Sequence, residues 1–171
     1  MARSTRYFLD CEFVEARGRV LEPVSVGVVA EDGRELYGCC ADTDLTAVTP
    51  FVTRHVLPQL PPPSSDAWRD RATLRDDLLA FLTADGRPEI WAWVAPYDHV
   101  VVAQLFGDMT ALPRELPRWT RDARQLWWHL GSPRLPKQRA GQHDALADAR
   151  HVRRVFVEHL APLARERGLV V

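Results

Sequence analysis

The sequence is poor in cysteine, has no long hydrophobic run and carries no excess of positive charge. Its three cysteines, Cys11, Cys39 and Cys40, form no CxxC pair, so neither a zinc ribbon nor a redox motif is expected. The longest apolar runs, such as residues 90–96, are far shorter than the ~20 residues of a membrane span. No apolar stretch of signal-peptide length follows the N-terminus, and we therefore expect a cytoplasmic protein with no membrane partner.

The charge balance limits how the chain could bind nucleic acid. It contains 22 lysine and arginine residues against 23 aspartate and glutamate residues, for a formal net charge of −1. A protein that binds nucleic acid through its overall charge is usually basic, so any attraction for phosphate must be local. Residues 114–139 are locally basic, with seven basic and two acidic side chains. This segment is either a phosphate-binding surface or an arginine-rich face in solvent.

What the chain does contain is enough for one domain with a hydrophobic core, because 46% of its 171 residues are hydrophobic. Apolar runs predict strands at 6–14, 22–30, 34–40 and 89–95. Capping residues and apolar periodicity predict helices at 44–60, from the N-cap Thr73 to Gly86, at 97–106 and at 144–160. A short strand or helix near 119–130 precedes a mobile loop over 131–142. This order predicts an α/β fold, in which a mixed sheet of three antiparallel strands followed by alternating helices and strands is flanked by helices.

Two carboxylates, Asp10 and Glu12, interrupt the first predicted strand. Residues i and i+2 of a strand point to the same face, so both carboxylates project together from an otherwise apolar segment. Burial of two unpaired carboxylates costs several kcal/mol, and a divalent cation would remove this penalty. The alternative is an edge strand with this face in solvent.

A third acid, Asp98, follows the strand predicted at 89–95 and lies in the first turn of the next helix. The N-terminal end of a helix favours a negative charge, so Asp98 either complements the helix dipole or joins the first two acids at a cation site. The neighbouring His99 is interpreted as a surface or supporting residue and not as a ligand.

A histidine and a fourth acid, His143 and Asp148, mark the start of the last predicted helix. Five residues correspond to ~140° of helical rotation, so the two side chains cannot share a helical face. They converge if His143 lies just outside the helix, Asp144 is its N-cap and Asp148 lies about one turn in. The alternative for His143 is an isolated loop histidine.

In their order along the chain, these residues resemble the three motifs of the DEDD exonuclease family. The motifs correspond to Asp10-Cys11-Glu12, to Asp98 and to His143-x-Ala145-x-x-Asp148. The tyrosine subclass has Tyr where this chain has Asp144, so the resemblance is to the histidine subclass. Longer stretches between residues 6 and 155, among them RYFLDCEFVE, WAWVAPYDHV and HDALADAR, resemble a bacterial branch of polyadenylate-specific 3′-exoribonucleases, the ribonuclease AS branch.

The resemblance implies a single RNase H-like exonuclease domain over residues 1–171, active on the 3′ ends of single-stranded RNA and above all on 3′ adenylates. It implies two Mg²⁺ or Mn²⁺ ions, and carboxylate oxygens suit such hard cations. The implied ligands are Asp10, Glu12, Asp98 and Asp148. His143 would be the general base, and nucleoside 5′-monophosphates would be the products. The resemblance also implies a homodimer, which would cover part of the tryptophan-rich surface near Trp127 and Trp128.

Two further residues are candidates for substrate contact. Phe13 follows the glutamate where the wider subclass has a small hydroxyl residue, although the polyadenylate-specific branch itself has Phe there. Its ring either stacks on the terminal base, which contributes ~1–3 kcal/mol per base, or belongs to the core. Ser25, on the neighbouring strand, either contacts the terminal nucleotide or is a core hydroxyl.

Three other functions stay open on the sequence. An oligoribonuclease or a DNA-proofreading exonuclease would use the same chemistry. A metal-dependent phosphohydrolase would act on nucleotides instead of polymers, and the basic segment at 114–139 argues weakly against it. A non-catalytic RNase H-like module would only bind nucleic acid or a partner, and the presence of all five expected active-site residues argues against it.

Overall fold

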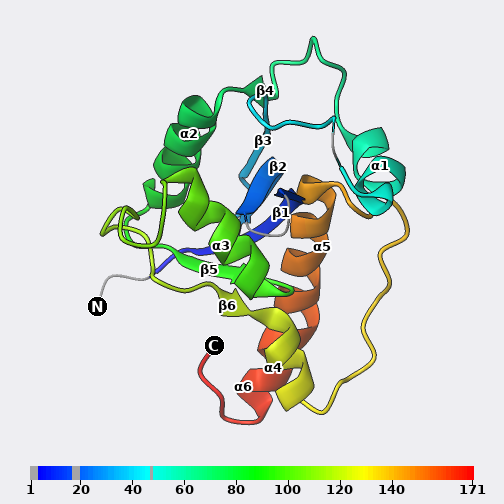
Figure 1. Cartoon of the computed structure of the whole chain (residues 1–171). Coiled ribbons are helices and arrows are strands. Elements are labelled where there is room, and N and C mark those ends of the chain that lie inside the picture. The colour runs from blue at the N-terminus through cyan, green and yellow to red at the C-terminus, as the bar shows by residue number, and fades with distance from the viewer. Residues whose placement is uncertain (1–3, 17–19, 47) are drawn as a thin grey trace.

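A mixed β-sheet between two layers of helices forms the framework of the computed structural model, which describes residues 4–16, 20–46 and 48–171 (Figure 1). Within these residues the sheet has six strands in the order β4-β3-β2-β1-β5-β6. Their bounds are β1 Arg6–Ala16, β2 Val20–Ala30, β3 Glu35–Cys40, β4 Trp68–Arg69, β5 Glu89–Ala92 and β6 Arg121–Asp122. Strands β1, β2 and β3 form an antiparallel meander, whereas β4, β5 and β6 each pair in parallel with a neighbour. The predicted α/β mixed sheet is therefore confirmed.

The helices follow the predicted order, with differences at their ends. Their bounds are α1 Pro50–His55, α2 Arg71–Thr83, α3 Ala95–Leu105, α4 Ala123–His129, α5 Ala145–Val155 and α6 Ala161–Glu166. The helix predicted over 44–60 is wrong in length, because Thr49 caps α1 directly before Pro50 and only a 3-10 turn at Leu57–Gln59 follows it. The helix predicted to end at 160 is longer, because the chain continues from α5 through a π-helical segment, Phe156–Leu160, into α6. Pro162 lies in the first turn of α6, where its ring removes one backbone hydrogen-bond donor.

The predicted N-cap of α2 is also wrong. The cap is Asp70, whose carboxylate accepts a hydrogen bond of 2.7 Å from the backbone N–H of Thr73. Thr73 is thus the capped residue and not the cap. Strand β4, which joins the edge of the sheet just before this helix, was not predicted, because two residues are too few to show an alternating pattern.

The alternation of side chains along β1 decides which residues face which helical layer. Tyr7, Leu9 and Cys11 pack into the cluster that contains the buried leucines of α2 and the valines of α3. Phe8 packs instead with Val152 and other apolar residues of α5 and its π-helical extension. Asp10 and Glu12 have the same parity as Phe8, so the side of the strand that carries them is the side covered by α5.

Helix α1 packs at one end of this sheet. Val52 and Val56 contact Val14 of β1 and Val24 of β2 in a separate small cluster. This packing brings α1 close to the N-terminal end of α5, as Figure 1 shows. No helix in the described part of the chain is long and apolar enough to span a membrane.

Candidate active site

The acidic residues and the histidine singled out in the sequence come together from three elements. The backbone N–H of Cys11 on β1 donates a 2.8 Å hydrogen bond to the Asp98 carboxylate, which ties the first turn of α3 to the strand. Ligand atoms of Glu12, His143 and Asp148 all lie within 4.8 Å of one another. Asp10, His143 and Asp148 line one cavity of about 530 Å³. Because these three are candidate catalytic residues, we call it the catalytic cavity. Three stretches far apart in the sequence therefore meet at one place.

A glycine on β2 allows α5 to approach the sheet this closely. Gly27 pairs with Asp10 across β1 and β2. A Cβ atom on Gly27 would lie 2.4 Å from the backbone C and O atoms of Ala145 and from the N atom of Leu146. These are backbone atoms of the first turn of α5, so no rotation of a side chain could make room. The bare backbone at this position sets how near Asp148 comes to the carboxylates of β1.

The start of α5 holds the histidine in place. Asp144 is the N-cap, as the spacing predicted, and its carboxylate accepts a 2.7 Å hydrogen bond from the N–H of Ala147. His143 lies just outside the helix with φ at 65°, a left-handed conformation that is uncommon for a side chain of this size. Its backbone N–H donates a 2.9 Å hydrogen bond to the Asp148 carboxylate. The Asp148 carboxylate thus lies close to Glu12 and also fixes the backbone of His143.

Burial and mutual repulsion disfavour the charged forms of these acids. Burial, and after it the neighbouring charges of Asp148, Asp98 and Asp144, together raise the pKa of Glu12 to about 8. Burial also raises the pKa of Asp98 to about 7, although its hydrogen bond from Cys11 works in the opposite direction.

The two other acids follow the same trend. Burial raises the pKa of Asp10 well above its ordinary value, with Asp98 and Asp148 as the leading charged neighbours. Burial raises the pKa of Asp148 despite its hydrogen bonds from Gln138 and His143. A set of carboxylates that resists ionisation by itself, with ligand oxygens close together, fits a hard divalent cation.

The loop between α4 and α5 closes one side of the catalytic cavity. Residues 135–138 and Trp93 line it together with Asp10, His143 and Asp148. Gln138 anchors this loop, because its side-chain amide donates hydrogen bonds of 2.5 Å to the Asp148 carboxylate and 3.1 Å to the carbonyl of Gly141. Gln138 could not be selected from the sequence, because a contact between a loop glutamine and Asp148 leaves no local sequence pattern.

Aromatic rings that the sequence did not identify surround the histidine. The Phe51 and His55 rings of α1 lie 5.0 Å and 5.6 Å from the His143 ring, measured between centroids.

Phe13 stacks on Tyr97, the residue before Asp98, at 5.7 Å and 12° between ring planes. Phe13 is half-buried against the α2 and α3 side of the sheet, and Tyr97 is exposed.

Ser25 is placed differently from the other candidates. It pairs with Glu12 across β1 and β2, but its side chain is only 1% exposed. A hydroxyl so deeply buried offers no surface to a nucleotide. The structure therefore favours the interpretation of Ser25 as a core hydroxyl.

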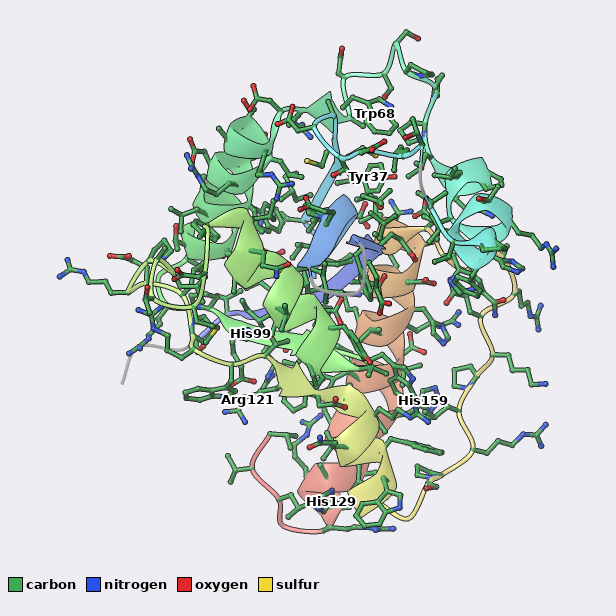
Figure 2. The ribbon with its side chains drawn as sticks, in the orientation of Figure 1. Tyr37, Trp68, His99, Arg121, His129 and His159 are labelled. Carbon is green, nitrogen blue, oxygen red and sulfur yellow. The ribbon has the colours of Figure 1, made fainter. Side chains whose placement is uncertain are left out.

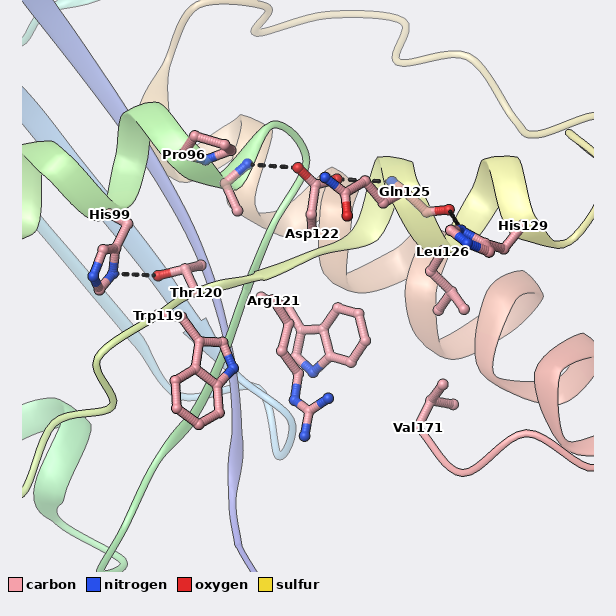
Figure 3. A pocket seen from close by; sticks show the side chains of 12 residues that line it. Pro96, His99, Trp119, Thr120, Arg121, Asp122, Gln125, Leu126, His129 and Val171 are labelled. Carbon is pink, nitrogen blue, oxygen red and sulfur yellow. Dashed lines mark hydrogen bonds between the residues drawn. The ribbon is translucent and has the colours of Figure 1, made fainter.

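A larger cavity, of about 650 Å³, lies on another side of the molecule, between α3, β6 and α4 (Figure 3). None of the five residues singled out for catalysis is among its described lining residues. His99 lines it, and its Nδ1 atom lies 3.1 Å from the Thr120 hydroxyl, a contact that joins α3 to the segment before β6. His99, Arg121 and His129 follow one another along this side of the molecule (Figure 2).

The basic segment at 114–139 does not form one surface. Arg118 and Arg121 line a further cavity near β5, and Arg121 pairs with Glu89 at 3.5 Å. Lys137 instead lines the catalytic cavity, and Arg139 lines a neighbouring one. The basic residues of this segment thus line different cavities, because the chain folds its two halves to different places.

Comparisons with known proteins identify relatives of the chain. Two 3′-5′ exoribonucleases of Mycobacterium tuberculosis, from strains H37Rv and CDC 1551, are each 52% identical to the chain over 153 residues, which cover 88% of the chain and 90% of each relative. No protein-family model matches the chain.

Solved exonucleases share the fold. An E. coli exonuclease I in complex with single-stranded DNA superimposes with a TM-score of 0.66 at 16% identity, over 96% of this chain and 41% of that one. The chain thus spans about two fifths of the length of exonuclease I. A full-length 3′-exonuclease superimposes with a TM-score of 0.56 at 13% identity, over 95% of this chain and 84% of that one. At such identities the likeness establishes the fold, which is RNase H-like.

Proposed function

The chain belongs to the family of the mycobacterial 3′-5′ exoribonucleases, and from this premise we propose that it is a metal-dependent enzyme that removes nucleoside 5′-monophosphates from the 3′ ends of single-stranded RNA. The observation that carries the proposal is the meeting of Glu12, His143 and Asp148 within 4.8 Å, beside Asp10 and Asp98. A nuclease needs such a set of carboxylates and one base at a single point. A binding module has no use for it.

Asp10, Glu12, Asp98 and Asp148 would hold two Mg²⁺ or Mn²⁺ ions. When bound, these ions supply positive charge that neutralises the scissile phosphate and stabilises the leaving oxygen. The four carboxylates would then ionise, because the cations replace the water that burial has removed. The hydrogen bond from Cys11 keeps Asp98 turned toward β1 during this change.

His143 would accept the proton of the attacking water at its imidazole. Its backbone is fixed by the hydrogen bond to Asp148, and its ring is bordered by Phe51 and His55. A base held at the edge of the carboxylate cluster can reach a water directed at phosphorus without moving its main chain. The stacked pair of Phe13 and Tyr97, beside Asp98, offers an aromatic surface for the terminal base.

We further propose a preference for 3′ adenylates, a cytoplasmic location and a homodimer, which rest on the resemblance to the polyadenylate-specific branch. The exposed rings of Trp119 and Trp128 support an interface with a second copy. Trp127 does not belong to that surface, because its ring packs against Trp93 and its Nε1–H donates to the carbonyl of Pro133.

The test uses a 5′-labelled RNA with a 3′ oligo(A) tail, incubated with the purified protein and Mn²⁺ or Mg²⁺, with and without EDTA. We expect stepwise shortening from the 3′ end and release of adenosine 5′-monophosphate, both abolished by EDTA and by Asp10→Ala. Parallel reactions on oligo(U), on dinucleotides and on DNA separate this function from an oligoribonuclease and from a DNA-proofreading exonuclease. Internal cleavage, or shortening that survives EDTA, would contradict the proposal.

A further inference from the structure

A second, smaller cavity of about 330 Å³ borders the catalytic cavity, and it is rich in arginine. Its lining consists of Gln138, Arg139, Ala140, Ala147, Arg150, His151 and Arg154. Gln138 and His151 line both cavities, so the two are contiguous. We call the smaller one the arginine cavity.

The arginine cavity carries unbalanced positive charge. Arg150 is paired with Glu35 through two hydrogen bonds of 2.7 Å and 2.5 Å, and its charge is thereby offset. Within the described residues no acidic side chain pairs with Arg139 or Arg154, and both are exposed. Arg154 donates a 3.0 Å hydrogen bond to His151 Nδ1, which directs its guanidinium along α5. No acidic residue is part of the lining.

The architecture of α5 connects the two cavities. Ala147, Arg150, His151 and Arg154 recur at helical spacing along one face of α5. Asp148 lies on the adjoining face, in the catalytic cavity. The opposite wall is the loop at 138–140, which Gln138 ties to Asp148 by its 2.5 Å hydrogen bond. The positions of the arginines are thus set by the same contacts that hold a catalytic carboxylate.

We propose that the arginine cavity binds backbone phosphates on the 5′ side of the scissile phosphate, so that it holds the strand whose last nucleotide occupies the catalytic cavity. This inference rests on the proposed function and extends it from a reaction to a class of substrate, a single-stranded polynucleotide of several residues. A polynucleotide must leave the catalytic cavity across a neighbouring surface. The guanidinium group matches two phosphate oxygens at once, and the chain as a whole has a net charge of −1 and offers no general attraction.

The test compares a double variant, Arg139→Ala with Arg154→Ala, with wild type on a 5′-labelled oligo(A) decamer. Binding is measured by fluorescence anisotropy in EDTA, without turnover. We expect the Kd to rise about tenfold or more, because two charge-assisted contacts are lost. We also expect the slope of log K against log salt to fall by ~1.4, at ~0.7 for each phosphate contact with a single strand. In the presence of metal, the ratio of kcat/KM for the decamer to that for a dinucleotide should fall by a similar factor.

A control double variant, Arg87→Ala with Arg167→Ala, removes the same charge from exposed positions that line neither cavity. It should keep the wild-type Kd and salt slope. Arg139→Lys with Arg154→Lys should keep most of the salt slope, and equal unfolding temperatures exclude loss of fold as the cause. If the Ala variant binds the decamer as the control does, the inference is overturned while the proposed function stands. If wild type binds the decamer through these arginines but degrades no RNA, only the proposed function fails.

Discussion

At the scale of single residues, the carboxylates of the site are acids in an environment that resists their ionisation. Glu12 and Asp98 have pKa values raised to about 8 and about 7, mainly by burial. In the unfolded chain both titrate near pH 4. Between the unfolded pKa of about 4 and the folded pKa values of about 7 and about 8, the metal-free folded chain binds more protons than the unfolded chain. Its free energy of unfolding therefore falls as the pH rises through this range.

We therefore expect the unfolding temperature of the metal-free protein to fall between about pH 5 and pH 8, by at least ~3 °C. Saturating Mn²⁺ should remove this fall, since cations favour the ionised carboxylates. Glu12→Gln should reduce the pH dependence in EDTA, because it removes one of the groups with a raised pKa. Differential scanning calorimetry over this range checks the prediction, and an unfolding temperature independent of pH in EDTA would contradict it.

The histidine gives a prediction of a different kind. His143→Ala removes the proton acceptor but leaves the four carboxylates, so the single-turnover rate on 3′-labelled RNA should fall by ~10²–10⁴. The stabilisation by Mn²⁺ should be retained. His129→Ala, at an exposed histidine in the larger cavity, is the matched control and should keep the wild-type rate. A His143→Ala rate close to that of His129→Ala would remove the histidine from the mechanism.

At the scale of elements, the start of α5 against β2 determines the geometry of the site. The two backbones approach so closely that Gly27 has no room for a Cβ atom, with Ala145 and Leu146 only 2.4 Å from the position of that atom. The same turn carries the N-cap Asp144 and, one turn later, Asp148. If a methyl group at position 27 displaced this turn, both His143 and the Asp148 carboxylate would move away from β1.

Gly27→Ala should accordingly destabilise the chain by about 1–3 kcal/mol through overpacking and also weaken the stabilisation by Mn²⁺. Urea unfolding with and without Mn²⁺ measures both effects. Leu82→Val is the control, because it removes one buried methylene group from the core of α2, away from the site, and should lower stability to a similar degree. Equal Mn²⁺ stabilisation in the Gly27 variant and the control would show that the close approach does not position the site.

The elements also show which features of the structure could be predicted from the sequence. Alternation along β1 was enough to place Asp10 and Glu12 on one face, and the spacing from His143 to Asp148 was enough to place the N-cap at Asp144. The start of α2 was missed because Asp70 and Thr73 are both capping residues, and only the direction of a hydrogen bond separates them. The anchoring by Gln138 and the rings of α1 could not be predicted, since they are contacts between segments far apart in the chain.

At the scale of the whole molecule, the chain has no excess of positive charge, but several of its basic side chains lie next to the carboxylates of the site. The basic segment at 114–139 is divided, and its last residues join Arg150 and Arg154 of α5 next to the catalytic cavity. A sequence count could not show this division, because it depends on where the loop between α4 and α5 runs. The meander and the mixed character of the sheet followed from the order of apolar runs, whereas β4 was not predicted.

The central claim is that four carboxylates from three elements bind divalent cations at one point. Isothermal titration of Mn²⁺ into the metal-free protein tests it most directly. We expect two ions per chain in wild type and loss of this binding in Asp10→Asn, while Asp32→Asn, at an exposed turn, keeps both ions. Absence of Mn²⁺ binding in wild type, or binding that Asp10→Asn leaves unchanged, would contradict the claim.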